Sequence, residues 1–385
     1  MKVKLGDIAV LINGDRGKNY PAQDEISSSG DIMFVNAGHL NGRRICFDGM
    51  NYISYEKYQS LNSGKFVAGD ILYCLRGSLG KKALVFKPSF GAVASSLVII
   101  RPNNAVVNSE YLMFALDSPN IQEQLSKANN GSSQPNLSAA SVREYRIDLP
   151  SLSEQSHITK LFSKAQSLIN IYRQQLHSLD TLIKARFVEM FGDPSINPKD
   201  YPIRSMSNIA EYWNGLTYKP EDVSEEGTVV LRSSNIQNMQ LDFADTIRVS
   251  CNIGSKKYVK ENDILMCSRN GSAKLVGKVA LIQGLNEAMS FGAFMMLIRS
   301  EYYPYLMTYF QLPAFRSQIT TGATTTINQI TGSMMDKVML PVPDKATMNE
   351  FAAFVSQVDK SKVAVQAALE KAQLLGDSLM QQYFG

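Results

Sequence analysis

Two long segments of the chain carry apolar residues in alternating steps of three and four, which gives a repeat of seven. The first segment, from Glu154 to Phe191, contains neither proline nor glycine, and the second covers residues 344–385. This spacing predicts amphipathic helices of the coiled-coil type, which need a partner because one apolar stripe alone is unstable in water. We expect the two helices to pair with each other in antiparallel orientation. The positions expected to form this coil or to contact other subunits are Leu161, Leu168, Tyr172, Leu176, Leu179, Ile183, Val358, Val365, Leu369, Leu375 and Leu379.

The rest of the chain is made of short strand-like runs separated by turn residues, as in a sheet-rich domain. A shorter helical stretch follows the runs in each half, at Ser109–Ala128 and at Tyr302–Thr320, with a bend expected at Pro119 and at Pro313. The strand-like runs are Ile32–Val35, Asp70–Cys74, Ala83–Phe86 and Ser96–Arg101, then Val229–Leu231, Asp263–Cys267, Lys278–Ile282 and Phe294–Arg299.

These patterns form an internal repeat. Phe191-Gly192 returns as Phe384-Gly385, and Asp70-Ile71-Leu72 returns as Asp263-Ile264-Leu265, in both cases 193 positions later. A chain that repeats one fold presents two similar surfaces, and such a chain suits a partner with two related sites. We therefore predict an α+β fold with two sheet-rich globular domains separated by two long antiparallel coiled-coil helices and a pseudo-twofold internal repeat. The expected parts are residues 1–150, 151–192, 193–343 and 344–385, alternately globular and helical.

Composition and charge narrow the function only a little. Hydrophobic residues make up 44% of the 385 and charged residues 19%, as in ordinary globular proteins. No apolar run reaches the ~18–20 residues that span a bilayer, and the first residues lack a signal-peptide core, so we expect a cytoplasmic protein that does not contact a membrane. The four cysteines lack zinc-type spacing and are expected to be reduced. A net charge of +4 is weak evidence for a polyanionic partner.

The chain lacks the usual sequence signs of catalysis. His39, His157 and His177 are scattered, and no Asn-Pro-Pro-Tyr or Asp-Pro-Pro-Tyr tetrad of an amino-methyltransferase is present. The glycines that precede Lys81 and Lys278 do not have the spacing of a nucleotide-binding P-loop. We expect a binding protein with no metal and no cofactor of its own.

Two polar segments in each half are candidates for contact with double-stranded DNA. A basic, Gly/Ser-rich loop follows the Asp-Ile-Leu strand, and it offers backbone amides and positive charge to phosphates, while Arg and Asn side chains also pair with base edges. One such loop alone would be interpreted as a solvated turn, but its presence in both halves favours DNA. The second segment begins at Asn36 and at Arg232 and differs in composition between the halves, which favours different base sequences. The candidate DNA-binding residues are Asn36, His39, Asn41, Arg43, Arg44, Arg76, Ser78, Lys81, Lys82, Lys219, Arg232, Ser234, Asn235, Arg269, Asn270, Ser272 and Lys274.

Several motifs follow one another in an order that resembles a known family. Gly131-Ser132-Ser133-Gln134-Pro135-Asn136-Leu137-Ser138 precedes Leu149-Pro150-Ser151-Leu152-Ser153-Glu154-Gln155, and the first long helix ends in Phe187-Val188-Glu189-Met190-Phe191-Gly192-Asp193. This order resembles the specificity (S) subunit of type I restriction–modification enzymes over the whole chain. The second half departs from the pattern, because residues 322–328 replace the Gln-Pro-Asn-Leu stretch and Asp344-Lys345-Ala346 replaces the Leu-Ser-Glu-Gln entry to the helix. The start of the second long helix is therefore left open.

The resemblance implies a non-catalytic DNA reader. Each sheet-rich domain would be a target recognition domain for one half of a split, asymmetric target, and the helices would set the spacing of the halves. Two modification (methyltransferase) subunits carrying S-adenosylmethionine would bind the helices and methylate adenine. Restriction subunits with translocase and nuclease activity, which use ATP and Mg, would join that core. The alternative is a coiled-coil scaffold that tethers two protein-binding modules.

Overall fold

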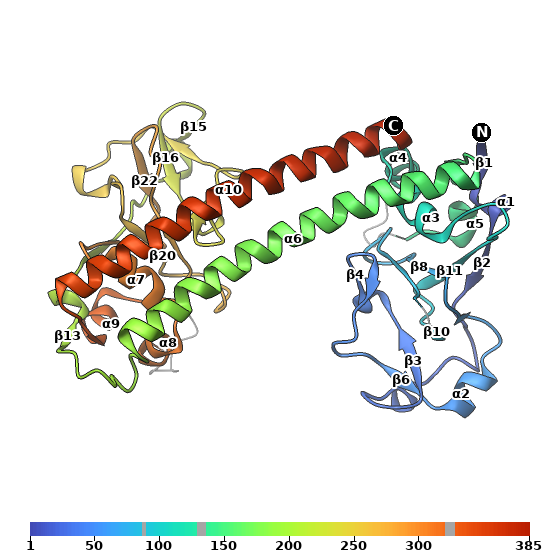
Figure 1. The fold of residues 1–385 in the computed structure, drawn as a ribbon, viewed down its shortest axis with the longest axis horizontal. Coiled ribbons are helices and arrows are strands. Elements are labelled where there is room, and N and C mark those ends of the chain that lie inside the picture. The colour runs from blue at the N-terminus through green and yellow to red at the C-terminus, as the bar shows by residue number, and fades with distance from the viewer. Residues whose placement is uncertain (87–89, 129–135, 320–327) are drawn as a thin grey trace. The chain divides into compact units, whose positions relative to one another are not determined.

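The computed structural model describes residues 1–86, 90–128, 136–319 and 328–385, shown in Figure 1. The chain forms two compact units. Unit 1 comprises residues 1–173 and 367–385, and unit 2 comprises residues 174–366. Each unit therefore contains a sheet-rich part together with a portion of both long helices.

Unit 1 contains two four-stranded sheets, and the strand order of each mixes segments distant in sequence. In the first sheet all neighbours are antiparallel, whereas the second contains one parallel pair, β3 with β10. The first sheet is β2 (Ala9–Asn13), β11 (Leu97–Pro102), β8 (Ile71–Cys74) and β9 (Lys82–Leu84), and the second is β6 (Tyr52–Ile53), β3 (Ile32–Val35), β10 (Gly91–Val93) and β7 (Lys65–Phe66). Two-stranded pairs join β1 (Lys2–Lys4) to β12 (Arg146–Asp148) and β4 (Leu40–Asn41) to β5 (Arg44–Ile45). The helices are α1 (Leu5–Ile8), α2 (Tyr55–Ser60), α3 (Ser109–Ala115), α4 (Pro119–Ala128) and α5 (Ala139–Arg143).

Unit 2 repeats this topology except at the edges of its second sheet, where the outer strand lies on the opposite side from β7 of unit 1. Its second sheet again contains one parallel pair, β16 with β22. The first sheet is β14 (Glu211–Asn214), β23 (Met295–Arg299), β20 (Ile264–Cys267) and β21 (Val279–Leu281), and the second is β15 (Val223–Ser224), β19 (Arg248–Val249), β16 (Thr228–Leu231) and β22 (Met289–Phe291). The pairs are β13 (Ile203–Ser205) with β24 (Met339–Pro341) and β17 (Ile236–Gln237) with β18 (Gln240–Leu241), and the short helices are α7 (Tyr303–Tyr309), α8 (Pro313–Ile319) and α9 (Gly332–Asp336). The predicted α+β class and the internal repeat are confirmed.

The Asp of the repeated Asp-Ile-Leu motif stabilises the same turn in both units. Asp70 is buried, and its carboxylate accepts two hydrogen bonds from the guanidinium of Arg101, at 2.8 and 2.7 Å. Asp263 is likewise buried and accepts two from Arg299, at 2.7 and 2.6 Å. Each Asp also accepts the backbone N–H of the residue three positions earlier. Paired, charge-assisted bonds of this kind hold a buried carboxylate that would otherwise be costly.

The two long helices, α6 (Leu152–Phe191) and α10 (Lys345–Phe384), contain 40 residues each. In unit 1 the beginning of α6 packs against the end of α10, with the rings of Phe162 and Phe384 5.7 Å apart. In unit 2 the end of α6 packs against the beginning of α10, with Phe187 and Phe351 also 5.7 Å apart. The helices are therefore antiparallel within each unit, as predicted. Among the described residues, no helix is both long enough and apolar enough to cross a membrane.

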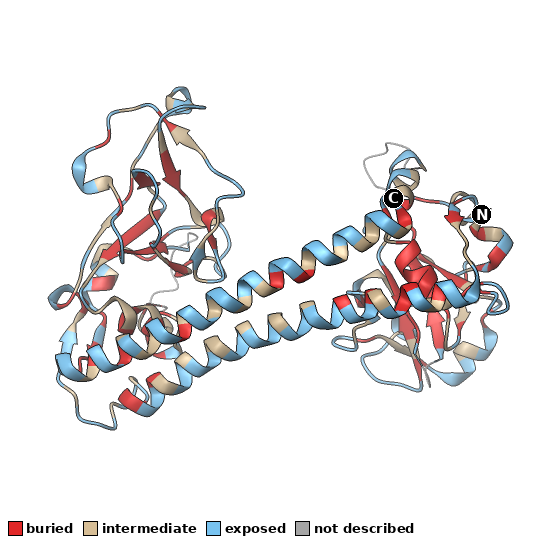
Figure 2. Ribbon diagram, turned by 45° about the horizontal axis from the view of Figure 1, so that its top comes forward, coloured by how far each residue is buried: buried red, intermediate tan, exposed pale blue. Residues whose placement is uncertain are grey.

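The buried stripe of these helices lies one position away from part of the predicted stripe. Phe162 is 5% exposed, whereas Leu168 is 41% exposed and Leu375 is 49% exposed, so the prediction that these two leucines lie in the helix pair is wrong. Phe162, Ile169 and Gly376 take the seam positions instead, because they keep the three-and-four spacing of the neighbouring buried residues. In Figure 2 most residues along the middle of both helices have the colour of exposed residues. The other predicted positions are buried or half-buried, namely Leu161, Tyr172, Leu176, Leu179, Ile183, Val358, Val365, Leu369 and Leu379.

A charged pair occupies the apolar seam in unit 2. The ammonium of Lys362 lies 2.7 Å from the carboxylate of Asp180 on the other helix and 3.4 Å from Asp359 on its own. The Lys362 side chain is only 14% exposed. A half-buried lysine within a seam favours the one register that gives it a carboxylate, since any other register leaves its charge unpaired.

The start of α10, which the sequence left open, is provided by Asp344. Its carboxylate accepts the backbone N–H of Thr347 at 2.9 Å and the hydroxyl of Thr347 at 2.8 Å. In α6 the corresponding cap is Ser151, 193 positions earlier, whose hydroxyl accepts the backbone N–H of Glu154 at 3.3 Å. Gln155, which is fully buried, additionally bonds to the backbone of Val106, Asn108 and Pro150. The two helices thus begin with the same kind of cap at matching positions, a serine hydroxyl in α6 and an aspartate carboxylate in α10.

The Phe-Gly motif that ends α6 is a helix C-cap. Gly192 has φ +76°, in the left-handed region, and its N–H bonds to the carbonyl of Val188 at 2.8 Å. A Cβ at this position would lie 2.3 Å from Cγ of Pro198. Only glycine fits this turn without strain.

We predict opposite effects of one substitution at two glycines. Gly376→Ala should raise the free energy of unfolding by about 0.5–1 kcal/mol, because alanine is the better helix former and its Cβ would lie 4.0 Å from Ile169. Gly192→Ala should lower it by at least about 1–2 kcal/mol, because of its positive φ and the contact with Pro198. Urea unfolding of both variants measures these changes. Destabilisation by Gly376→Ala would contradict the position assigned to Gly376 in the seam.

Candidate nucleic-acid interface

The loop that follows β8 in unit 1 presents Arg76 on a fixed backbone. The N–H of Leu75 bonds to the carbonyl of Ser96 at 2.9 Å, and the carbonyl of Leu75 accepts the N–H of Leu137 at 2.8 Å. Arg76 itself forms an antiparallel bridge with Asn136. The Arg76 side chain is exposed.

The loop that follows β20 in unit 2 has the same framework. The N–H of Ser268 bonds to the carbonyl of Phe294 at 2.9 Å, and the carbonyl of Ser268 accepts the N–H of Ile330 at 2.7 Å. Arg269 forms an antiparallel bridge with Gln329. The two arginines therefore have equivalent backbone surroundings, and Arg269 is also exposed.

The thiol of a buried cysteine contacts the backbone carbonyl of each arginine. The thiol of Cys74 lies 3.0 Å from the carbonyl oxygen of Arg76, and the thiol of Cys267 lies 3.7 Å from that of Arg269. Burial raises the pKa of both thiols, so they stay protonated and can donate to these carbonyls. The two cysteines are structural, and both are free of disulfides.

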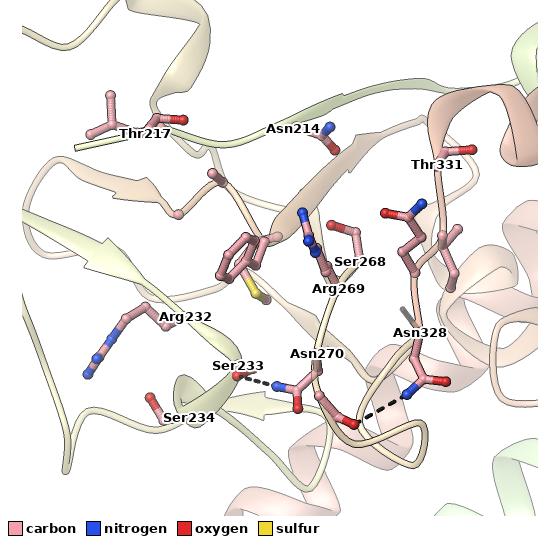
Figure 3. A pocket seen from close by; sticks show the side chains of 18 of the residues that line it. Asn214, Thr217, Arg232, Ser233, Ser234, Ser268, Arg269, Asn270, Asn328 and Thr331 are labelled. Carbon is pink, nitrogen blue, oxygen red and sulfur yellow. Dashed lines mark hydrogen bonds between the residues drawn. The ribbon is translucent and has the colours of Figure 1, made fainter. Parts of the chain in front are cut away.

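In unit 2 this loop borders a cleft of about 1180 Å³, shown in Figure 3. The guanidinium carbon of Arg269 lies 5.3 Å from the centre of the Phe294 ring, which is 59% exposed. Cation and ring together give the wall a flat, positively charged face. The polar side chains of the lining come from five separate segments, namely Asn214 to Tyr218, Arg232 to Ser234, Asp245, Ser268 to Asn270, and Asn328 to Thr331.

Side-chain amides fix the shape of this wall. Nδ2 of Asn270 donates to the hydroxyl of Ser233 at 3.3 Å, and its Oδ1 accepts the N–H of Ser272 at 2.9 Å. Nδ2 of Asn328 donates to the carbonyl of Gly271 at 3.3 Å, as Figure 3 shows. The loop is therefore tied to two other segments, and its polar atoms are held in place before any ligand binds.

Unit 1 has a cleft of about 780 Å³ bordered by the segments at Asn36 and Ser96. Its lining is richer in aromatic residues, including Tyr20, Phe47 and Tyr52. The two clefts share the segments at Asn36 and Ser96, which correspond to Arg232 and Phe294, but their other side chains differ. Arg269 lines the cleft of unit 2, whereas Arg76 lies outside the cleft of unit 1.

Most predicted DNA-binding residues lie at the surface. Asn41, Arg44, Arg76, Ser78, Lys81, Lys219, Arg269, Ser272 and Lys274 are exposed, and Asn36, Arg232, Ser234 and Asn270 are half-buried. Two of these cations already have carboxylate partners, since Arg232 lies 2.8 Å from Asp245 and Lys219 lies 3.5 Å from Glu221.

Lys82 and Arg43 both have partners inside unit 1, although Arg43 lies in the turn between β4 and β5 as expected. Lys82 begins β9 and is buried, and its ammonium bonds to the carbonyl of Leu116 at 3.2 Å and to the carboxylate of Asp117. Burial lowers the pKa of Lys82, while Asp117 favours its charged form. The guanidinium of Arg43 lies 3.6 Å above the ring of Phe114 and 3.4 Å from Asp117. Both side chains form an ion pair with Asp117 inside unit 1, so neither points into solvent as a free cation.

His39 is also turned inward and stabilises its own loop. The ring is 6% exposed, its Nδ1 accepts the N–H of Asn36 at 3.1 Å, and its Nε2 lies 3.1 Å from the carbonyl of Gly49. This arrangement assigns the proton to Nε2. The imidazole therefore has no free polar atom for a base edge.

Asn235 occupies the position in unit 2 that His39 occupies in unit 1. It is 1% exposed, and its Oδ1 accepts the N–H of Arg232 at 2.8 Å. Its Nδ2 donates to the carbonyls of Asp242 and Asp245 at 2.8 and 2.9 Å. The exposed position predicted for Asn235 is corrected to a buried one.

Several lining residues were missed from the sequence, above all Phe294, Asn328 and Gln329. Phe294 was assigned to a strand, but it lies just before β23. The signal available was its place in the repeat, since Phe294 corresponds to Ser96. The motif residues 131–135 and 322–327 lie outside the described part of the chain. Within the described part, no group of three His, Cys, Asp or Glu residues is placed to hold a metal ion.

Residues 1–180 match the family model of the type I restriction modification DNA specificity domain. The type I restriction enzyme MjaVIII specificity subunit of Methanocaldococcus jannaschii is 22% identical over 246 residues, which cover 57% of this chain and 57% of that protein. The matched region thus spans less than two thirds of the length of this relative.

Two solved structures share the fold over the whole chain. A chain from a study of complex assembly and conformational transition in a type I restriction–modification system has a TM-score of 0.57 at 16% identity, covering 100% of this chain and 97% of that one. The S subunit of a type I system from M. genitalium has a TM-score of 0.55 at 14% identity, with 100% and 96% covered. The family match, the curated relative and these folds confirm the resemblance that the motifs indicated.

We predict that Asn235 stabilises the fold. Asn235→Ala should lower the free energy of unfolding by about 2–3 kcal/mol, because it removes a buried side chain that bonds to three backbone groups. Ser234→Ala, one residue earlier and half-buried, should change it by less than about 0.5 kcal/mol. Thermal and urea unfolding measure both. Equal stability of the two variants would contradict the inward role of Asn235.

Proposed function

We propose that this chain, a relative of the specificity subunits of type I restriction–modification enzymes, is a non-catalytic subunit that selects a DNA sequence. In this proposal the cleft of each unit reads one half of a bipartite, asymmetric target. The observation that carries it is the repeated loop framework, which presents Arg76 and Arg269 in equivalent surroundings beside side chains that differ. A reader of two different half-sites needs this combination of shared framework and divergent polar surface.

The chemistry of the clefts suits the edge of a DNA duplex. Arginine and asparagine side chains pair with guanine and adenine edges, and threonine and serine bond to bases or phosphates. The cleft of unit 2 presents Arg269, Asn270 and Asn328 from segments that hydrogen bonds hold together. Preformed polar groups of this kind bind without first ordering a loop.

The partners in this proposal are two modification subunits, which carry S-adenosylmethionine and methylate adenine in each half-site. Restriction subunits that use ATP and Mg would join this core, and the present chain would bind no cofactor. The long helices support such a role, because their exposed surface carries large apolar side chains that typically mark protein interfaces. These side chains are Leu168, Ile171, Leu182, Val188, Val363, Leu374 and Leu375.

The function is tested by sequencing the methylome of cells that co-express this chain with the modification subunit encoded beside it. We expect N6-methyladenine in both halves of one asymmetric, bipartite motif, and its absence in cells that express the modification subunit alone. Co-purification without any methylated motif would favour the coiled-coil scaffold instead. Methylation of the same motif without this chain would contradict a role in selecting the sequence.

We further predict that the long helices set the spacing of the two half-sites. One seven-residue repeat inserted after Ser178 in α6, together with one after Val363 in α10, keeps the apolar seam and the pair of Asp180 with Lys362. Each helix grows by about 10.5 Å, so the spacer in the methylated motif should lengthen by about three base pairs. Ser178→Ala without an insertion is the control and should keep the original spacer. An unchanged spacer in the doubly extended protein would contradict this role.

A further inference from the structure

An exposed arginine occupies the same backbone position in each unit. Arg76 and Arg269 follow strands of matching register, each receives a contact from a buried thiol at its carbonyl, and each forms a bridge with an amide residue, Asn136 or Gln329. Among the described residues, neither guanidinium has a carboxylate within salt-bridge distance, and the guanidinium of Arg269 lies over the ring of Phe294. Each is therefore available to a ligand.

The positions around these arginines differ between the units. In unit 1 the positions compared are Asn36, Gly38 and Ser96, and the carbonyl of Ser96 accepts the N–H of Leu75 beside Arg76. The corresponding positions of unit 2 are Arg232, Ser234 and Phe294. Amide, hydroxyl, guanidinium and aromatic groups make different contacts with base edges, so these positions cannot present the same surface to DNA.

We infer that Arg76 and Arg269 are equivalent, sequence-independent phosphate anchors, and that the divergent positions beside them select the bases. This inference rests on the proposed function. Two half-sites of an asymmetric target differ in base sequence but not in phosphate backbone. Equivalent arginines in equivalent surroundings can make the same contact in both units if that contact is to the phosphate backbone, which both half-sites have in common.

The distinction from base reading is physical and measurable. A phosphate contact releases counterions, so its loss reduces the slope of log affinity against log salt by about one, and it weakens binding to all sequences equally. A bidentate contact with guanine contributes about 1–3 kcal/mol of discrimination, and it requires the planar fork of arginine. Lysine keeps the charge but loses the fork.

The experiment measures binding of the full chain, purified with its modification subunit, to two duplexes over a range of salt concentrations. One duplex carries the methylated motif, and the other has both half-sites scrambled. We expect Arg76→Ala and Arg269→Ala to weaken both complexes by the same factor, about 3–30-fold, and to lower each salt slope by about one. Arg269→Lys should restore most of the affinity. Phe294→Ser, which places the unit 1 residue in unit 2, should instead change the bases preferred in one half-site and keep the salt slope.

The outcomes separate the inference from the function beneath it. Weaker binding of Arg269→Ala to the cognate duplex alone, without rescue by lysine, identifies a base reader and overturns the inference while the function stands. Unchanged affinity of both alanine variants also overturns it. A wild-type complex that binds both duplexes equally overturns the proposed function itself. Thermal unfolding of each variant confirms that the fold is intact.

Discussion

The burial of one apolar stripe on each long helix is the constraint on which the rest of the fold depends. A 40-residue amphipathic helix gains most of its stability from packing, so α6 and α10 need each other and a core at their ends. Aromatic rings meet this need twice. In unit 1 the Phe384 ring lies 5.4 Å from Tyr111. In unit 2 the Phe351 ring lies 5.2 Å from Phe191. Each globular core therefore includes both helices. Removal of either helix would expose aromatic rings of the other helix and of the globular part.

This constraint explains which parts of the repeat stay alike. Residues that join strands to helices keep their partners in both units, as Tyr111 bonds to the carbonyl of Asp148 and Tyr305 bonds to that of Pro341. The helix starts keep the same cap geometry with different residues, because Ser151 accepts the N–H of Glu154 and Asp344 accepts that of Thr347. The two units therefore need the same packing geometry. They need the same residue only where one residue type alone allows that geometry, as glycine does at the positive φ of Gly192.

The sequence was sufficient for the long helices, the strands and the repeat, because these leave a periodic pattern. It was insufficient where a side chain's partner lies far along the chain. Lys81 and Lys82 are adjacent and look alike, but strand alternation turns Lys82 inward to Asp117, 35 positions later. His39 looked like a polar loop residue until its carbonyl partner, Gly49, was placed beside it. The prediction for Leu168 was wrong for another reason. Leu161 with Leu168 and Phe162 with Ile169 both keep a spacing of seven, so the sequence pattern alone does not show which pair is buried.

The repeat also provides an internal test of what a charge does. A charged residue that both units retain for folding finds its partner inside the unit, as Asp70 does with Arg101 and Asp263 does with Arg299. Arg76 and Arg269 are retained at equivalent positions, yet no carboxylate pairs with either one in the described part of the chain. Stability of the isolated units gives no reason for two unpaired guanidinium groups to stay in register on a fixed backbone. A ligand with the same negative charge at both units does give one, and a DNA duplex offers that charge at every step.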